Sequence, residues 1–456
     1  MKFPNKKELF SFLESTSNRA TLTKGTAGSF LIQGGFAGLS FAIATLLARL
    51  LGSQGYGAYA NAMAWVGIFG TIASFGFGSI LVRDVAILRS QKQWADLKGF
   101  LRYSNRFVLF FSILLVLVIL VIARVIYSAP DKEMMRSSLW VASLLIPLSA
   151  LATLNQSTTR GLERVVHSLL PDLIIRPMLI LMGILIIYYI LPGDLNSLVA
   201  MGISVFAAAI TLGLSSIWLK GFLPLEVNQA HPNYKIRVWM GAAFPMLVYG
   251  GLQIIISQTS TVLLGTQSSA EDVGLYAVAY RLSYLLTFFL GAVHIAMGPA
   301  MARLNAKGEK ERLQRILTLI VRVTFLLTLL LSLVFLFASN HILAVFGPEF
   351  IAAKAALGIL ILGNLLDVAS GSPTLLLVMT GHERSVAVIF AFISFINIVL
   401  NLWFISSYGF IGAALASVIS LFLSRCIMVV YSVMTLQLNP TIFSFSKNGR
   451  SKNERP

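Results

Sequence analysis

The sequence predicts an all-α polytopic membrane protein, and three observations support this fold class. Of the 456 residues, 57% are hydrophobic and only 12% are charged, whereas soluble chains carry roughly 25% charged residues. So few charges cannot coat a water-soluble domain of this length. Apolar stretches of about 20 residues, the length that a helix needs to cross a bilayer, recur along the chain. Basic residues collect in alternate loops, as the positive-inside rule requires.

The composition also excludes several classes of protein. Although the net charge is +17, the basic residues lie between apolar stretches and do not form one aqueous face, so we expect no nucleic-acid partner. Cys426 is the only cysteine, which excludes an intramolecular disulfide. The loops are too short for an aqueous domain, and the sequence has no GxxxxGK[ST] phosphate loop and no recognisable catalytic spacing. We therefore expect a transporter, with no enzymatic activity and no resident cofactor or metal.

About twelve transmembrane helices are expected, in two groups of six. A polar N-terminal segment, residues 1–24, has no cleavable signal pattern and is expected in the cytoplasm. The first bundle covers residues 25–219, a cytoplasmic linker covers 220–238, the second bundle covers 239–434, and 435–456 form a cytoplasmic tail. The predicted spans are 28–51, 58–82, 107–127, 137–156, 169–191 and 197–219, then 239–264, 276–300, 316–338, 355–380, 385–405 and 410–434.

The two halves contain an internal repeat. The stretch RLLGSQGYGAYANA, which begins at Arg49, is echoed by TVLLGTQSSAEDVGLYAVA, so that Gly57 and Tyr59 recur as Gly274 and Tyr276 at one constant offset. The alternative is coincidence, since turns favour glycine and membrane interfaces favour tyrosine. An even number of spans in each half makes the repeat parallel, and two such bundles around a central cavity are the architecture of an alternating-access carrier.

Ionisable side chains inside the bilayer are expensive and by default face a cavity or a partner. The candidates for binding are mostly cationic: Arg176, Arg281 and Arg425 lie within predicted spans, and Arg49 lies at the end of one. This balance favours an anionic cargo, and arginine suits phosphate because its planar fork donates two hydrogen bonds at once. For each arginine, pairing with another helix or capping a turn is the alternative.

Two residues are candidates for coupling to a proton or sodium gradient. Asp367 is the only carboxylate deep in a predicted span, and His294 lies among glycines within another. The alternatives are a salt bridge for Asp367 and a packing role for His294. Amide side chains that would meet sugar hydroxyls are Asn155, Gln253, Gln258 and Asn364. The same amides are equally suited to hydrogen bonds between helices.

Three motifs together resemble one known family. ARLLGSQGYGAYANA followed by FGFGSILVRDVA, then LLGTQSSAEDVGLYAVAYRL, and finally NIVLNLWFISSYGFIGAALASVIS are similar to signatures of the polysaccharide-exporter branch of the multidrug/oligosaccharidyl-lipid/polysaccharide flippase superfamily, which includes the Wzx-type O-antigen flippases. The resemblance covers nearly the whole chain. One departure is Thr259, Ser260 and Thr261, where many relatives carry an aspartate, and it weakens any coupling role for this span.

The resemblance implies a flippase that moves an undecaprenyl-diphosphate-linked oligosaccharide, such as an O-antigen, capsule or exopolysaccharide repeat unit, from the inner to the outer leaflet of a bacterial plasma membrane. Both chain termini would be cytoplasmic, and polysaccharide polymerase machinery would be a partner. The main rival is an ion-coupled multidrug or small-molecule antiporter of the same superfamily. Such a carrier would be expected to place acidic residues in its cavity, and this chain has mainly arginines there.

Overall fold

The computed structural model describes residues 19–190, 195–287, 297, 301 and 303–444, with side chains from Ile32 onward. These ranges are helical and contain no strand. Nine helices within them are long and apolar enough to cross a membrane. The predicted all-α, multi-pass membrane class is therefore confirmed, while the count of twelve stays a prediction. The segment that carries His294 lies outside the described residues.

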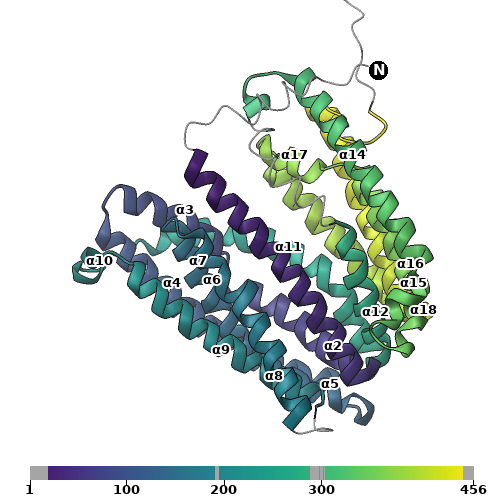
Figure 1. Ribbon diagram of the computed structural model, residues 1–456. Helices are drawn as coiled ribbons and strands as arrows, with labels where there is room; N and C mark the ends of the chain where they lie inside the picture. The colour runs from purple at the N-terminus through teal and green to yellow at the C-terminus, as the bar shows by residue number, and fades with distance from the viewer. Residues whose placement is uncertain (1–18, 191–194, 288–296, 298–300, 302, 445–456) are drawn as a thin grey trace, which may run out of the picture.

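The helices follow one another in two sets joined by a short linker (Figure 1). The first set is α2 (Arg19–Ala73), α3 (Phe77–Ser90), α4 (Trp94–Ile126), the 3-10 helix η1 (Pro130–Lys132), α5 (Glu133–Ser143), α6 (Leu145–Gly161), α7 (Val165–Leu170), the π-helix η2 (Pro171–Ile175), α8 (Arg176–Ile190) and α9 (Ser197–Phe222). The linker contains α10 (Leu225–Gln229). The second set is α11 (Ile236–Gln267), α12 (Ala270–Tyr284), η3 (Leu285–Thr287), α14 (Lys310–Phe337), α15 (Ser339–Ala344), η4 (Pro348–Ala353), α16 (Lys354–Ala369), α17 (Pro373–Met379) and α18 (Glu383–Leu436).

Glycines divide the two longest helices where the sequence predicts span boundaries. Gly52 breaks α2 with φ 67° and ψ −179°, and Gly409 breaks α18 with φ 55° and ψ −133°. Other residues rarely adopt such positive φ values, because a Cβ atom would meet the backbone. Each long helix therefore consists of two consecutive helical parts. The first part of α2 corresponds to predicted span 28–51, and the two parts of α18 correspond to 385–405 and 410–434. Predicted span 58–82 is wrong at its end, because α2 ends at Ala73 and positive φ values at Phe75 and Gly76 form a turn before α3.

The sequence-based boundaries fail where a helix extends beyond the apolar stretch. α4 begins at Trp94, so the polar segment that we expected as a loop before residue 107 is helical and continuous with its span. Its first turns are stabilised by burial of one face, since Leu97, Phe100 and Leu101 are buried. Hydropathy alone misses this part of the helix, because charged residues occupy its other face.

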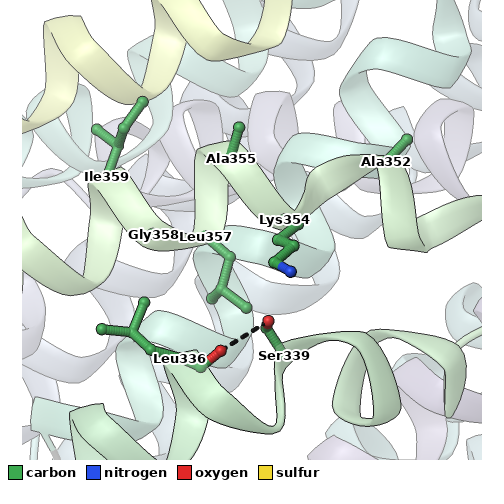
Figure 2. A pocket seen from close by; sticks show the side chains of 8 residues that line it. All are labelled: Leu336, Ser339, Ala352, Lys354, Ala355, Leu357, Gly358 and Ile359. Atoms are coloured by element: carbon green, nitrogen blue, oxygen red, sulfur yellow. Dashed lines mark hydrogen bonds between the residues drawn. The ribbon is translucent and has the colours of Figure 1, made fainter.

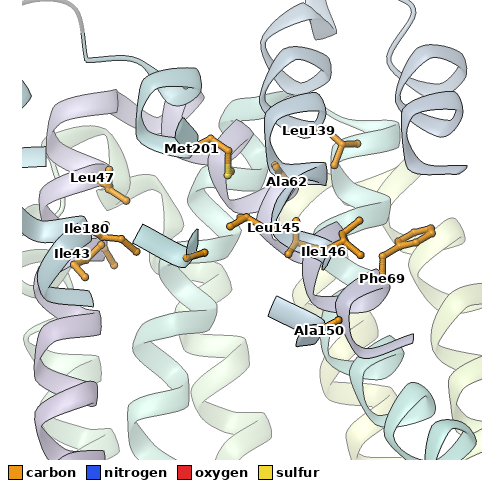
Figure 3. Close-up of a cluster of buried hydrophobic side chains, with 14 of the residues drawn as sticks. Ile43, Leu47, Ala62, Phe69, Leu139, Leu145, Ile146, Ala150, Ile180 and Met201 are labelled. Carbon is orange, nitrogen blue, oxygen red and sulfur yellow. The ribbon is translucent and has the colours of Figure 1, made fainter. Parts of the chain in front are cut away.

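The two sets of helices share one cluster of buried apolar side chains, which also takes in Trp239 at the start of α11. One cluster of buried apolar side chains runs from α2 and α6 through α12 to η4 and α16, whereas a separate cluster lies within the second set around Leu313, Leu376 and Phe390. Figure 3 shows the part of the larger cluster that lies within the first set, where Ile43 and Leu47 of α2 lie with Ile180 of α8. In Figure 1 the helices α2, α5 and α12 come together at the lower end, while α10 and α17 lie far apart at the other.

The linker is fastened to the first bundle. The buried carboxylate of Asp96 in α4 accepts hydrogen bonds from Asn233 Nδ2 at 2.6 Å and from Lys235 Nζ at 2.8 Å. The ring of Trp239, near the start of α11, stacks on Phe100 with centroids 4.9 Å apart. The first turns of α11 thus pack against the first bundle, although most of the helix contacts α2 and α18.

Replacing Asp96 with alanine is expected to destabilise the protein by about 1.5 to 3 kcal/mol, because the hydrogen bonds that Asn233 and Lys235 donate to its buried carboxylate are lost. Thermal unfolding of the purified protein in detergent measures this change. Glu226→Ala in the same linker is the matched control, because Glu226 is exposed and makes no ion pair with a described residue. Equal melting temperatures for the two variants would contradict the proposed anchoring of the linker.

Candidate functional site

The repeated glycines meet at the shared core. A Cβ atom at Gly57 of α2 would overlap the carbonyl oxygen of Ala270, and one at Gly274 of α12 would overlap the carbonyl oxygen of Ser53. The two backbones therefore touch at positions that the repeat relates to each other. The repeated tyrosines also have matching contacts: Tyr59 bonds to Ser204 of α9 at 3.1 Å, and Tyr276 bonds to Ser417 of α18 at 2.9 Å.

Two of the predicted phosphate-binding arginines join the two bundles at this same end. Arg49 of α2 donates from Nε to the carbonyl oxygen of Val345, 2.6 Å away, in the turn after α15. Arg281 of α12 donates to the carbonyl oxygen of Ser40 in α2 at 2.6 Å and also to the Ser40 hydroxyl. We call the Gly57–Gly274 contact with these two arginine contacts the latch. In this conformation, a backbone carbonyl oxygen already accepts a hydrogen bond from each of these two guanidinium groups.

A polar cavity of about 340 Å³ lies among α11, α12, α16 and α18. Four residues that the sequence nominates, from three helices, line it: Gln253, Asn364, Asp367 and Arg425. The structure adds lining residues that the sequence analysis did not nominate: Ser257, Tyr280, Ser283 and Tyr284. Amides, hydroxyls and one ion pair thus face a space within the second bundle.

The charges in this cavity cancel each other. Arg425 Nε donates to Asp367 Oδ1, and another guanidinium nitrogen donates to the Thr374 hydroxyl at 2.6 Å. The Asp367 and Arg425 side chains are only 10% and 21% exposed. Of the two roles left open for Asp367, the ion pair with an arginine is the one seen here. Among its described lining residues, the cavity consequently offers no uncompensated carboxylate to an organic cation.

The amide candidates separate into two groups. Gln253 and Asn364 line the cavity, where the Asn364 amide donates to the carbonyl oxygen of Ser283 at 2.8 Å. Gln258 lies near Gly67 of α2 and therefore between the bundles. Asn155 is buried inside the first bundle and donates to Ser216 of α9 at 2.9 Å. Its amide nitrogen is therefore engaged in a contact between helices.

Arg176 differs from the other three candidate arginines. It is the first residue of α8, directly after the π-helix η2, and it is half-buried. Its guanidinium makes no hydrogen bond or ion pair with the residues that the structure describes. Among the four candidates it is thus the one with its donors available, and a π-helical turn often marks a functional position in a helix.

Three of the lining residues that sequence reasoning missed, Tyr280, Ser283 and Tyr284, come from α12. Their spacing of three and four residues places them on one face of α12. That spacing is the available signal, but the same pattern also describes a packed helix face. Only the position of α16 and α18 beside this face of α12 identifies it as a cavity wall.

Comparison with protein families identifies this architecture. The model of the polysaccharide biosynthesis protein family matches residues 22–305. The chain belongs to this family. A second model, MatE, matches residues 245–403. This assignment confirms the predicted resemblance to a membrane-embedded flippase family of polysaccharide biosynthesis.

Two curated relatives of this family member carry transporter names. It is 25% identical over 272 residues to the probable flippase AglR of Haloferax volcanii, an alignment that covers 56% of each chain. It is also 25% identical over 315 residues to a putative O-antigen transporter of Salmonella typhi, covering 64% of this chain and 68% of the relative. The chain therefore aligns with little more than half the length of AglR.

Solved structures confirm the fold of this family member. A multidrug resistance MATE family transporter in an inward-facing conformation superposes with a TM-score of 0.70 at 14% identity, covering 88% of this chain and 94% of that chain. The lipid II flippase MurJ in an inward closed conformation gives a TM-score of 0.69 at 13% identity, covering 91% and 88%. At such identities the likeness concerns the fold alone.

Proposed function

We propose that this protein flips a polyprenyl-diphosphate-linked oligosaccharide from the inner to the outer leaflet of a bacterial plasma membrane, with both termini in the cytoplasm. The observation that carries the proposal is the neutral, amide- and hydroxyl-lined cavity around the Asp367–Arg425 pair. Neutral sugars need such alternating donors and acceptors, whereas an organic cation needs a free carboxylate. The family membership and the names of the relatives support the same class of cargo.

The charged part of the cargo would bind to arginines. Arg176 has its hydrogen-bond donors available. When the latch opens, Arg281 and Arg49 would release the backbone carbonyl oxygens that they now contact and donate to phosphate oxygens in their place. Gln253 and Asn364 would contact the glycan, and the polyprenyl chain would stay in lipid. A proton or sodium gradient, or the membrane potential, would drive the cycle, and polymerase machinery would receive the product. The two ends of the space between the bundles would open and close in turn, so that the cargo reaches one side of the membrane and then the other by alternating access.

The decisive experiment measures leaflet translocation of a short polyprenyl-diphosphate oligosaccharide in proteoliposomes. The wild type is expected to move this lipid, and Arg176→Gln is expected to move it roughly tenfold more slowly, because one charge-assisted hydrogen bond to phosphate is lost. Arg124→Gln is the matched control, since Arg124 is exposed at the end of α4.

Two results would count against the proposal. If folded wild-type protein moved no such lipid under any imposed gradient but exchanged organic cations, the protein would be an antiporter of the multidrug type. If Arg176→Gln and Arg124→Gln were slowed equally, the flippase assignment would stand but the role of Arg176 in binding phosphate would fall.

A further inference from the structure

A second cavity, of about 650 Å³, lies between α14 and the start of α16 (Figure 2). Its walls are mainly apolar, with Leu336 on one side and Leu357 and Gly358 on the other, while Ile359 lines it but is directed away from Leu336. Gly358 leaves part of the wall open, since a Cβ atom there would make only ordinary contact with Leu336. The Ser339 hydroxyl is engaged with the carbonyl oxygen of Leu336. An apolar groove of this kind fits a hydrocarbon chain.

Lys354, the first residue of α16, supplies the charge of this groove. Figure 2 shows its ammonium group directed into the space toward Ser339. Lys354 makes no ion pair or hydrogen bond with the residues that the structure describes. The nearest acidic residue in the sequence, Glu349, is directed toward Gly347 and Gly52. The ammonium is therefore left for an external anion.

Other basic residues at the same end of the molecule are engaged. Arg49 bonds to Val345, Lys132 donates to the carbonyl oxygen of Thr266, and Arg136 pairs with Glu133. At this end, Lys354 and Arg124 have no such partner in the described part of the chain, and Arg124 is not among the residues that line the groove. The apolar groove beside its unpaired ammonium distinguishes Lys354 from a lysine whose side chain only extends toward the membrane–water interface.

The position of the groove indicates which lipid it would hold. α14 packs against α15, α16 and η3 of its own bundle, and it lies at the edge of the molecule away from α2 (Figure 1). A cargo that passes between the bundles would not reach this face. A lipid of the surrounding bilayer would reach it directly.

We propose that this groove is a binding site for an anionic phospholipid of the outer leaflet. Its phosphate binds the Lys354 ammonium, and one acyl chain lies against Leu336 and Gly358. The placement in the outer leaflet rests on the proposed orientation of the chain, whereas the preference for an anionic lipid does not depend on the transport function. The bound lipid would hold α14 against α16.

Native mass spectrometry of the delipidated full-length protein tests this site. The protein is offered equal amounts of phosphatidylglycerol and phosphatidylcholine with identical acyl chains. Because one basic residue near a membrane surface contributes about 1 kcal/mol to anionic lipid binding, Lys354→Gln is expected to lower the preference for phosphatidylglycerol about fivefold. Arg124→Gln, which removes the same charge elsewhere, is expected to keep the preference of the wild type.

A second variant tests the groove independently of charge. Gly358→Leu fills the space beside Leu336 and is expected to reduce binding of both lipids, while Lys354→Arg is expected to keep the preference. Thermal unfolding verifies that each variant is folded. The proposal is overturned if Lys354→Gln and Arg124→Gln retain phosphatidylglycerol equally, or if the lipid that copurifies at this site is a polyprenyl phosphate.

Discussion

Replacing Gly57 with leucine is expected to abolish transport while leaving each bundle folded. Gly57 touches the backbone of α12 at Ala270, so a larger side chain would force α2 and α12 apart. Overpacking of this kind costs about 1 to 3 kcal/mol or more. At 3 kcal/mol, the equilibrium shifts roughly 100-fold away from the state in which the latch is closed. Translocation in proteoliposomes measures the loss.

The repeat supplies a second version of the same test. Gly274→Leu is expected to have the same effect as Gly57→Leu, because the two glycines contact each other's helix backbone at related positions. Gly213→Leu in α9 is the control, since nothing lies within 4 Å of the position that its Cβ would occupy. Wild-type transport by both latch variants would show that closure at this end is not needed in the cycle.

The second large effect is expected for Arg425→Gln. This change leaves the carboxylate of Asp367 buried without its cation, and breaking a buried pair from one side costs about 3 to 5 kcal/mol. The melting temperature in detergent is expected to fall sharply. The double variant Asp367→Asn with Arg425→Gln removes both charges and is expected to recover most of the lost stability, because the uncompensated charge is gone.

The double variant also distinguishes the two roles proposed for Asp367. If the pair only stabilises the second bundle, the folded double variant would transport at the rate of the wild type and respond to the same ion gradient. If Asp367 couples transport to a proton or sodium gradient, the double variant would fold but lose its response to the imposed gradient. A double variant as unstable as Arg425→Gln alone would refute the ion pair as the source of the stability effect.

Local features of the sequence determined the fold class and most span boundaries. The length of an apolar stretch is set by bilayer thickness, and the breaks at Gly52 and Gly409 coincide with predicted boundaries because glycine tolerates positive φ there. The polar start of α4 was missed, because its helical form depends on burying one face against neighbouring helices. The repeat was also visible in the sequence as a constant offset.

The contacts of the candidate site were decided by the tertiary structure. The sequence nominated Arg49, Arg281 and Arg425 for phosphate, but each finds a protein partner far away along the chain: Val345, Ser40 and Asp367. Arg176 carries the same charge and has no such partner among the described residues. The sequence by itself predicted which arginines lie within membrane spans, because that follows from the apolar residues on either side of each arginine along the chain. Only the packing of helices decided which guanidinium groups are engaged, because their partners are brought close by the fold and not by the chain.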